Sequence, residues 1–128
     1  MSQTAQQASG QWGEAAAESL LTREGLKVLN RNYRCRAGEI DLVMLDPDTE
    51  DGDVVVFVEV RLRSPGARVE AIETVDRNKQ RKLSQAAQHF LMSKPVYTNH
   101  ACRFDVVAID DPESKPVWLR NAFDASGW

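Results

Sequence analysis

Two short apolar runs on either side of an acidic turn dominate the pattern of hydrophobic and polar positions. The first run is 38–43 (GEIDLV) and the second is 54–63 (VVVFVEVRLR), and both are rich in β-branched residues. The segment between them, 46–53 (DPDTEDGD), has the composition of a turn. Short β-branched runs joined by a turn predict two strands paired as an antiparallel hairpin.

The alternation of side chains along strands determines which residues of this hairpin share a face. If Val43 lies opposite Phe57, then Asp41 lies opposite Glu59 at about 5 Å, where like charges destabilise a sheet. Such a pair needs a cation, and magnesium binds two carboxylates while keeping water and phosphate ligands. The alternative is a surface ion cluster, in which the pair is neutralised by Arg61, Arg63 or Arg36.

Two segments have the periodicity of amphipathic helices. The first is predicted from about Gln11 to Glu24, with Ser9 as its cap and Gly25 at its end. In its first turn, Glu14 has the favourable dipole position of a carboxylate at a helix start. The second helix is predicted to begin at a Thr74 cap and to end before Pro95, with a core-facing stripe of Leu83, Ala86, Ala87, Phe90 and Leu91.

Further strands surround these elements. Residues 26–32 form a modest strand, and 102–109 form a clear one, in which Arg103 is expected to contact Asp105. Residues 117–119 predict a short edge strand, and 121–123 predict a terminal turn that packs Phe123 on the domain. The order α-β-β-β-α-β predicts an α/β fold with a mixed sheet flanked by helices.

Composition is that of a single globular domain. The chain has 128 residues, 42% hydrophobic and 27% charged. We expect 1–10 to be a disordered extension and 11–128 to be one domain. No apolar run approaches the ~20 residues of a membrane span, and 1–10 lack the pattern of a secretion signal, so we expect a cytoplasmic protein with no membrane contact. Cys35 and Cys102 have no metal or redox spacing and are expected to be reduced.

Charge is unevenly distributed along the chain. The net charge of −3 argues against a protein that coats nucleic acid, but 61–82 holds seven basic residues against three acidic ones. Basic residues in the first turns of the second helix oppose its dipole, so they favour a role such as phosphate binding. The alternative is an ordinary solvated helix face. The residues predicted to contact nucleic acid are Arg63, Arg77, Lys79 and Lys82.

These motifs resemble known families. Asp41 followed by Glu59-Val60-Arg61 on the next strand resembles the PD-(D/E)xK nuclease core. More closely, the chain is similar to the YraN family of small bacterial proteins, over nearly all of its length after the first ten residues. The matching residues are Gly13-Glu14, Gly25, Asn32, 38–43, 56–61, Arg63, Lys79, 82–83, 86–87, 103–107 and 121–123.

The resemblance implies a restriction-endonuclease-like fold, related to archaeal Holliday junction resolvases. It also implies that Asp41 and Glu59 bind a metal, that Val60 adds its backbone carbonyl, and that Glu14 assists the metal site. The expected ion is Mg²⁺, with Mn²⁺ as the alternative, and its role would be to polarise the phosphate and activate water. By analogy with resolvases, we expect hydrolysis of structured or branched DNA by a homodimer.

One position departs from the nuclease pattern, because Arg61 stands where E-x-K has lysine. Arginine stays protonated and cannot act as a general base, although it can grip a phosphate or stabilise developing charge. Lys79 or Lys82 is then a candidate for a migrated amine. The second hypothesis is a non-catalytic module on a degenerate nuclease fold that binds nucleic acid or another protein.

Overall fold

The computed structural model describes residues 5–62, 75–110, 113 and 115–125, with the backbone alone for 5–10. Along these residues the chain forms α1 (Ala5–Arg23), β1 (Lys27–Cys35), β2 (Gly38–Thr49), β3 (Gly52–Leu62), α2 (Arg77–Ser93), the 3₁₀ turn η2 (Pro95–Tyr97), β4 (Ala101–Ile109) and β5 (Val117–Phe123). This confirms the α/β class and the α-β-β-β-α-β order, to which β5 is added. No helix in these ranges is long and apolar enough to cross a bilayer.

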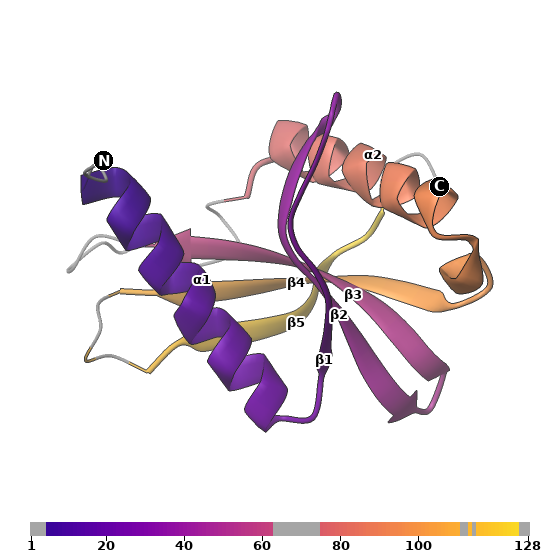
Figure 1. Cartoon of the computed structure of the whole chain (residues 1–128), viewed down its shortest axis with the longest axis horizontal. Coiled ribbons are helices and arrows are strands. Elements are labelled where there is room, and N and C mark those ends of the chain that lie inside the picture. The colour runs from indigo at the N-terminus through magenta and orange to yellow at the C-terminus, as the bar shows by residue number, and fades with distance from the viewer. Residues whose placement is uncertain (1–4, 63–74, 111–112, 114, 126–128) are drawn as a thin grey trace.

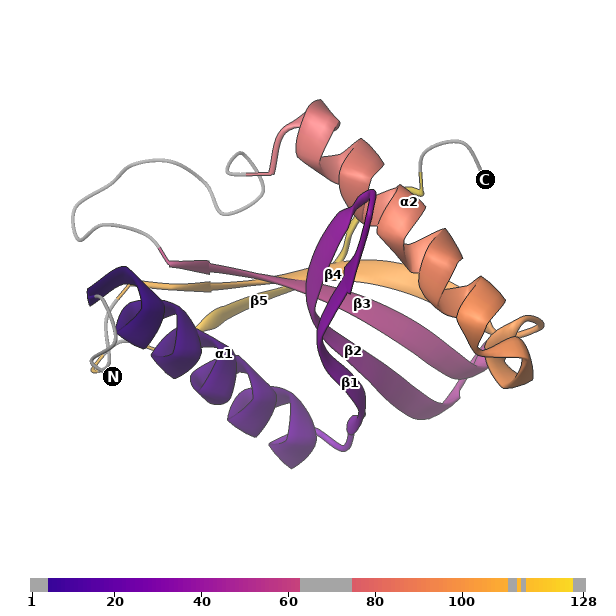
Figure 2. The same ribbon diagram turned by 45° about the horizontal axis from the view of Figure 1, so that its top comes forward.

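The strands form one mixed sheet in the order β1-β2-β3-β4-β5. Only the β3–β4 pair is parallel among the described strand pairs, since α2 lies on the crossover between those two strands. The two helices lie on opposite faces of the sheet, as Figures 1 and 2 show. The sheet is therefore covered on both sides, which explains the near-continuous apolar run at 54–58.

Alternate residues of β2 and β3 contribute to two separate cores. On the α2 face, Val43 and Phe57 pack with Phe90 in one buried cluster. On the α1 face, Met44 and Val56 pack with Leu21 in the other. The predicted stripe of α2 is confirmed, since Leu83, Ala86, Ala87 and Phe90 are buried and Leu91 packs against their cluster.

The predicted hairpin register is confirmed, because Val43 pairs with Phe57 in the β2–β3 ladder. The predicted turn at 46–53 is too long. The strands extend to Thr49 and resume at Gly52, with a register shift after Asp46. Asp48 and Gly52 have φ of 58° and 81°, which short polar residues and glycine accept, so the chain reverses in a tight turn.

The helix starts differ from the predictions. α1 begins at Ala5, so it includes part of the segment expected to be disordered, and Ser9 lies inside it and not at a cap. Residues 1–4 lie outside the described residues. α2 is capped by Asp76, whose carboxylate accepts from the Lys79 N–H at 2.8 Å. The predicted cap, Thr74, also lies outside the described residues.

The last strand is longer than predicted. β5 continues through 121–123, which was expected to be a turn, and the Phe123 ring stacks on Phe104 at 4.9 Å between centroids. The predicted packing of Phe123 is thus confirmed, although a strand provides it. Asn121, with a φ of 51°, marks an irregularity in the strand.

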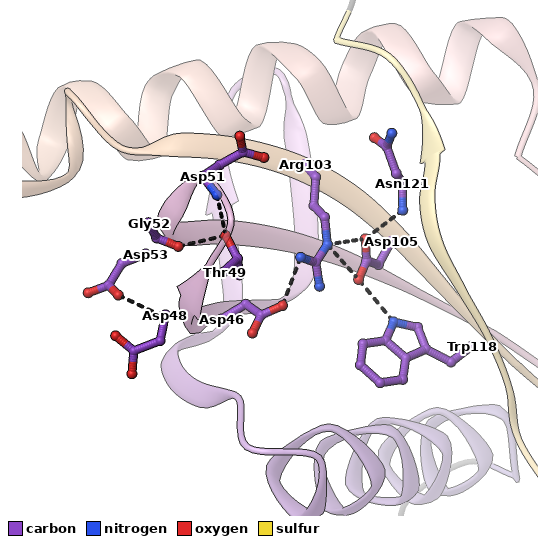
Figure 3. A network of polar contacts seen from close by, with 10 residues as sticks. All are labelled: Asp46, Asp48, Thr49, Asp51, Gly52, Asp53, Arg103, Asp105, Trp118 and Asn121. Carbon is purple, nitrogen blue, oxygen red and sulfur yellow. Dashed lines mark hydrogen bonds and ion pairs between the residues drawn. The ribbon is translucent and has the colours of Figure 1, made fainter.

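A buried polar network ties β5 to the sheet, as Figure 3 shows. Asp105 is fully buried and accepts from Arg103 Nε at 3.0 Å, which confirms the predicted contact. It also accepts from Trp118 Nε1 and from the Asn121 N–H, both at 2.9 Å. Arg103 Nη1 donates to Asp46 at 2.8 Å. Three donors satisfy the Asp105 carboxylate, so the network is well suited to hold the strands together.

The β1–β2 hairpin projects beyond the rest of the sheet as an arm. β2 pairs with β3 from Leu42 onward, whereas residues 38–40 pair with β1. We define the arm as residues 31–41; Figures 1 and 2 show it rising from the sheet toward α2. It exists because β1 continues to Cys35, three residues past the end of the predicted strand.

Candidate active site

The site lies at the fork where β2 separates from β3. The last described pair of their ladder is Leu42 with Val58, after which the N–H of Val60 needs another partner. Asp41 provides it: its Oδ2 accepts from the Val60 N–H at 2.8 Å. The separation of the strands therefore positions Asp41 beside the end of β3, close to Glu59.

Glu59 is the buried carboxylate of the fork, with a side chain only 7% exposed. Its Oε1 lies 3.5 Å from Arg61 Nε and 3.8 Å from Lys79 Nζ. Burial, followed by the charge of Asp41, raises the pKa of Glu59 to about 7, although both cations oppose the shift. Near neutral pH this carboxyl is therefore poised between its protonated and ionised forms.

Asp41 and Glu14 also have raised pKa values. For Asp41 the main cause is burial, which the Val60 hydrogen bond opposes. For Glu14, burial and then the charge of Asp41 raise the pKa, while a hydrogen bond from Asn32 lowers it. Electrostatic interactions thus link Glu14 to Asp41 and Asp41 to Glu59, as the predicted convergence of the three carboxylates requires.

The three carboxylates are linked through Asp41, which interacts with Glu14 and with Glu59. Among the described residues, no three His, Cys, Asp or Glu side chains form a group that could hold a metal ion. Glu14 instead lines a cavity of about 320 Å³ with Asn32 and Leu42 on the α1 side of the fork.

The donor set fits magnesium. Mg²⁺ is commonly held by one or two carboxylates and takes its other ligands from water and phosphate. Asp41 and Glu59 provide two carboxylates, one of them with an oxygen already oriented by the Val60 N–H. The contribution of the Val60 carbonyl stays a prediction, and the Val60 N–H holds Asp41.

The cations near the fork come from β3 and α2. Arg61 Nε is buried and has no hydrogen-bond partner in the structure, although it is close enough to Glu59 for an ion pair. Lys79, which reaches Glu59, lies in the first turn of α2, and Asp76 caps that turn. An Asp three residues before this lysine was the sequence signal for the cap, and it was missed in favour of Thr74.

The remaining predicted contacts lie further from the carboxylates. Arg77 is exposed at the start of α2. Lys82 is exposed one turn beyond Lys79 and lies against the arm, where a Cβ on Gly38 would meet the Lys82 Cβ at 3.7 Å. Arg63 lies outside the described residues. The structure therefore brings Glu14, Asp41, Glu59, Arg61 and Lys79 together, and places Lys82 beside the arm.

Comparison with known sequences identifies the family. Residues 13–109 match the model of "Uncharacterised protein family UPF0102". A UPF0102 protein of Stutzerimonas stutzeri is 51% identical over 121 residues, covering 93% of this chain and 97% of the relative. Another, from Pseudomonas syringae pv. syringae, is 44% identical over 128 residues, covering 98% of this chain and 100% of the relative.

A solved structure that aligns with the chain does so weakly. SfsA of Pyrococcus furiosus in complex with Ca²⁺ has a TM-score of 0.26 and 10% identity, over 85% of this chain and 60% of that one. That likeness is too slight to bear on fold or function. The family match, by contrast, spans every carboxylate of the site as well as Arg61 and Lys79. The chain therefore belongs to UPF0102, the YraN family that its motifs resemble.

Proposed function

We propose that this protein is a metal-dependent endonuclease that hydrolyses phosphodiester bonds in structured or branched DNA. The observation that carries the proposal is the pair of Asp41 and Glu59 at the fork. The charge of Asp41 raises the pKa of Glu59, and burial raises the pKa of both carboxyls, so keeping both ionised destabilises the fold even with Arg61 and Lys79 beside Glu59. A divalent ion would offset that repulsion, so the pair supports a metal-dependent function.

Each residue of the fork would have a distinct part in the reaction. A bound Mg²⁺ would polarise the scissile phosphate and lower the pKa of water. Asp41 and Glu59 would hold the ion, with Asp41 kept in orientation by the Val60 N–H. Glu14 would assist from α1 through its interaction with Asp41.

The cations would stabilise the charge of the phosphate. Arg61 cannot act as a base, but its guanidinium lies beside Glu59 and would supply a permanent positive charge to a phosphate bound there. Lys79 brings an amine to Glu59 from a different element, which supports its role as the substitute for the lysine of the motif. Both would act as electrostatic stabilisers of a transition state with added negative charge.

A second function is favoured by Arg61 itself. If an arginine in the place of the motif lysine abolishes the chemistry, the same surface would remain a nucleic-acid-binding module. A homodimer, expected from the resemblance, would place two such forks on one substrate under either function. Light scattering at several protein concentrations would test that assembly.

The test is cleavage of a labelled panel of single strand, duplex, flap and four-way junction DNA, with Mg²⁺ and then Mn²⁺. Wild type is compared with Asp41→Asn and Glu59→Gln, which keep the shape of each side chain but remove its charge. The proposal predicts metal-dependent cleavage by wild type only, strongest on a branched substrate. Binding without cleavage by all three proteins would favour the second function. Neither binding nor cleavage by wild type would contradict both.

A further inference from the structure

We infer that the arm and the first turns of α2 form one cationic rim, which holds the sugar–phosphate backbone of DNA beside the Asp41–Glu59 pair. This rests on the proposed function and adds a second DNA-binding element to it. Sequence reasoning placed the DNA contacts on α2 and its neighbourhood, whereas the structure adds the arm residues Arg34 and Arg36.

The alternation of side chains on the arm orients these arginines. Tyr33 and Cys35 are half-buried against the α2 core, whereas Arg34 and Arg36 are exposed. Arg34 pairs with Glu39 across the hairpin, and the same register places Asn32 opposite Asp41. Arg34 therefore shares a face of the arm with Glu39, whereas Asn32, with a φ of 52°, interrupts the alternation between this pair and Asp41. The arm thus presents Arg34 and Glu39 together, two residues beyond Asp41 along the hairpin.

The spacing along the arm suits successive phosphates. At roughly 3.3 Å per residue, Arg34 lies about 7 Å further along the arm than the Asn32–Asp41 pair, and Arg36 follows it in the turn after Cys35. A DNA strand carries one phosphate per about 3.4 Å of duplex axis. A strand with its scissile phosphate at Asp41 would therefore pass the two arginines with its neighbouring phosphates.

The arm and α2 are continuous where their cations meet. Gly38, at the end of the arm's turn, lies against Lys82, as the 3.7 Å approach to the Lys82 Cβ shows. Lys79, one turn earlier in α2, reaches the fork. The cations therefore extend from the fork along α2 to the tip of the arm.

The arm is held in place and does not need DNA to order it. Tyr33 Oη hydrogen-bonds His89 Nδ1 of α2. The Tyr33 ring also meets Phe90 edge-on at 5.3 Å between centroids. Anchored residues alternating with exposed arginines are the arrangement expected of a preorganised binding element, since little entropy is lost when it binds.

Glu39 is the one acidic side chain among the arm's exposed residues 31, 32, 34, 36 and 39. Its Oε2 lies 3.2 Å from Arg34 Nε, with the two side chains 53% and 76% exposed. An ion pair this exposed is weak, so a phosphate can replace Glu39 as the partner of Arg34. Glu39 would therefore oppose DNA binding, and removing its charge would strengthen it.

The test measures the affinity of the protein for a labelled duplex and a labelled four-way junction. The buffer contains a metal chelator, and the salt concentration is varied. Arg34→Ala/Arg36→Ala is compared with wild type and with Arg23→Ala/Lys94→Ala, which removes two exposed charges at the end of α1 and just after α2. We expect the arm variant to bind DNA at least about tenfold more weakly. The slope of its log binding constant against log salt concentration should be smaller in magnitude by about two, because two phosphate contacts are lost. The control should match wild type, and Glu39→Gln should bind more tightly than wild type.

The outcomes separate this inference from the proposed function. If the arm variant binds as tightly as the control while wild type cleaves DNA, the arm has no part in binding and the nuclease proposal stands. If wild type does not bind DNA at all, both are wrong. Because Arg34 and Arg36 are exposed, unchanged thermal melting will show that a loss of binding is not a loss of folding.

Discussion

The Val60 N–H donates to Asp41 Oδ2 at 2.8 Å at the point where β2 and β3 separate. One carboxylate thus has two roles. It satisfies a backbone donor that the sheet leaves unpaired, and it places a negative charge beside Glu59. The fork is therefore both the place where the β2–β3 ladder ends and the centre of the candidate site.

Substitutions of Asp41 will separate these two roles. Asp41→Asn keeps an acceptor for the Val60 N–H and removes the repulsion with Glu59, so we expect the unfolding free energy to rise by about 1 kcal/mol. Asp41→Ala leaves the N–H without that partner and should be about 1–3 kcal/mol less stable than the Asn variant. Both should lose DNA cleavage. Urea unfolding at pH 8 in the presence of a chelator measures the two stabilities. Equal stability of the two variants would contradict the role of Asp41 as the acceptor of the Val60 N–H.

The stability of the metal-free protein will depend on pH through Glu59. Its pKa of about 7 in the folded protein exceeds its usual 4.5. Between pH 4.5 and pH 7 the folded protein therefore keeps a proton on Glu59 that the unfolded chain has lost. The contribution of Glu59 to unfolding free energy is thus greatest below pH 4.5. It falls as pH rises through 7, by up to about 3 kcal/mol.

Glu59→Gln is the control for this pH dependence. The variant has no titrating group at this position, so the difference between its unfolding free energy and that of wild type should grow from pH 5 to pH 8. Urea unfolding at four pH values in a chelator measures the difference. A constant difference would mean that Glu59 does not titrate in this range.

Much of the site followed from strand alternation. The Val43–Phe57 register was predictable because apolar residues on both strands must face the same core. The ladder ends at Leu42 and Val58, so the register brings Asp41 and Glu59 to the fork without pairing them. The Arg103–Asp105 contact followed from their shared face.

The arm was not predictable, because its outer half buries little and has no regular apolar pattern. The tight approach of Lys79 to Glu59 depends on how α2 packs across the sheet, which local sequence does not encode. The extension of α1 to Ala5 and of β5 to Phe123 reflects tertiary packing and pairing that overrode weak local signals.

The cap of α2 offers a test of how Lys79 is positioned. Asp76→Ala should cost about 1 kcal/mol in stability and loosen the first turn, so it should also lower the cleavage rate. Asp76→Asn keeps the cap and should restore both quantities. Lys79→Ala should reduce cleavage without the loss of stability that the Asp76→Ala variant shows. Cleavage under single-turnover conditions, together with thermal melting, measures these effects.

The buried network around Asp105 should be important for folding. Asp105→Ala would leave Arg103, the Trp118 indole N–H and the Asn121 N–H without their shared partner, at a cost of about 3–5 kcal/mol. Trp118→Phe removes one of these hydrogen bonds and should cost about 1–3 kcal/mol. Chemical unfolding followed by far-UV circular dichroism measures both. A loss below 1 kcal/mol in Asp105→Ala would show that the network does not stabilise the fold.

The measurement that tests the central claim most directly is titration calorimetry of Mn²⁺ into the metal-free protein at pH 8. We predict saturable binding by wild type, and no detectable binding by Asp41→Asn or Glu59→Gln when both variants melt as folded proteins. Binding by wild type should weaken as the pH is lowered toward 6, since Glu59 must then lose a proton. Equal Mn²⁺ binding by wild type and both variants would contradict the assignment of the metal to this pair, as would no binding by wild type.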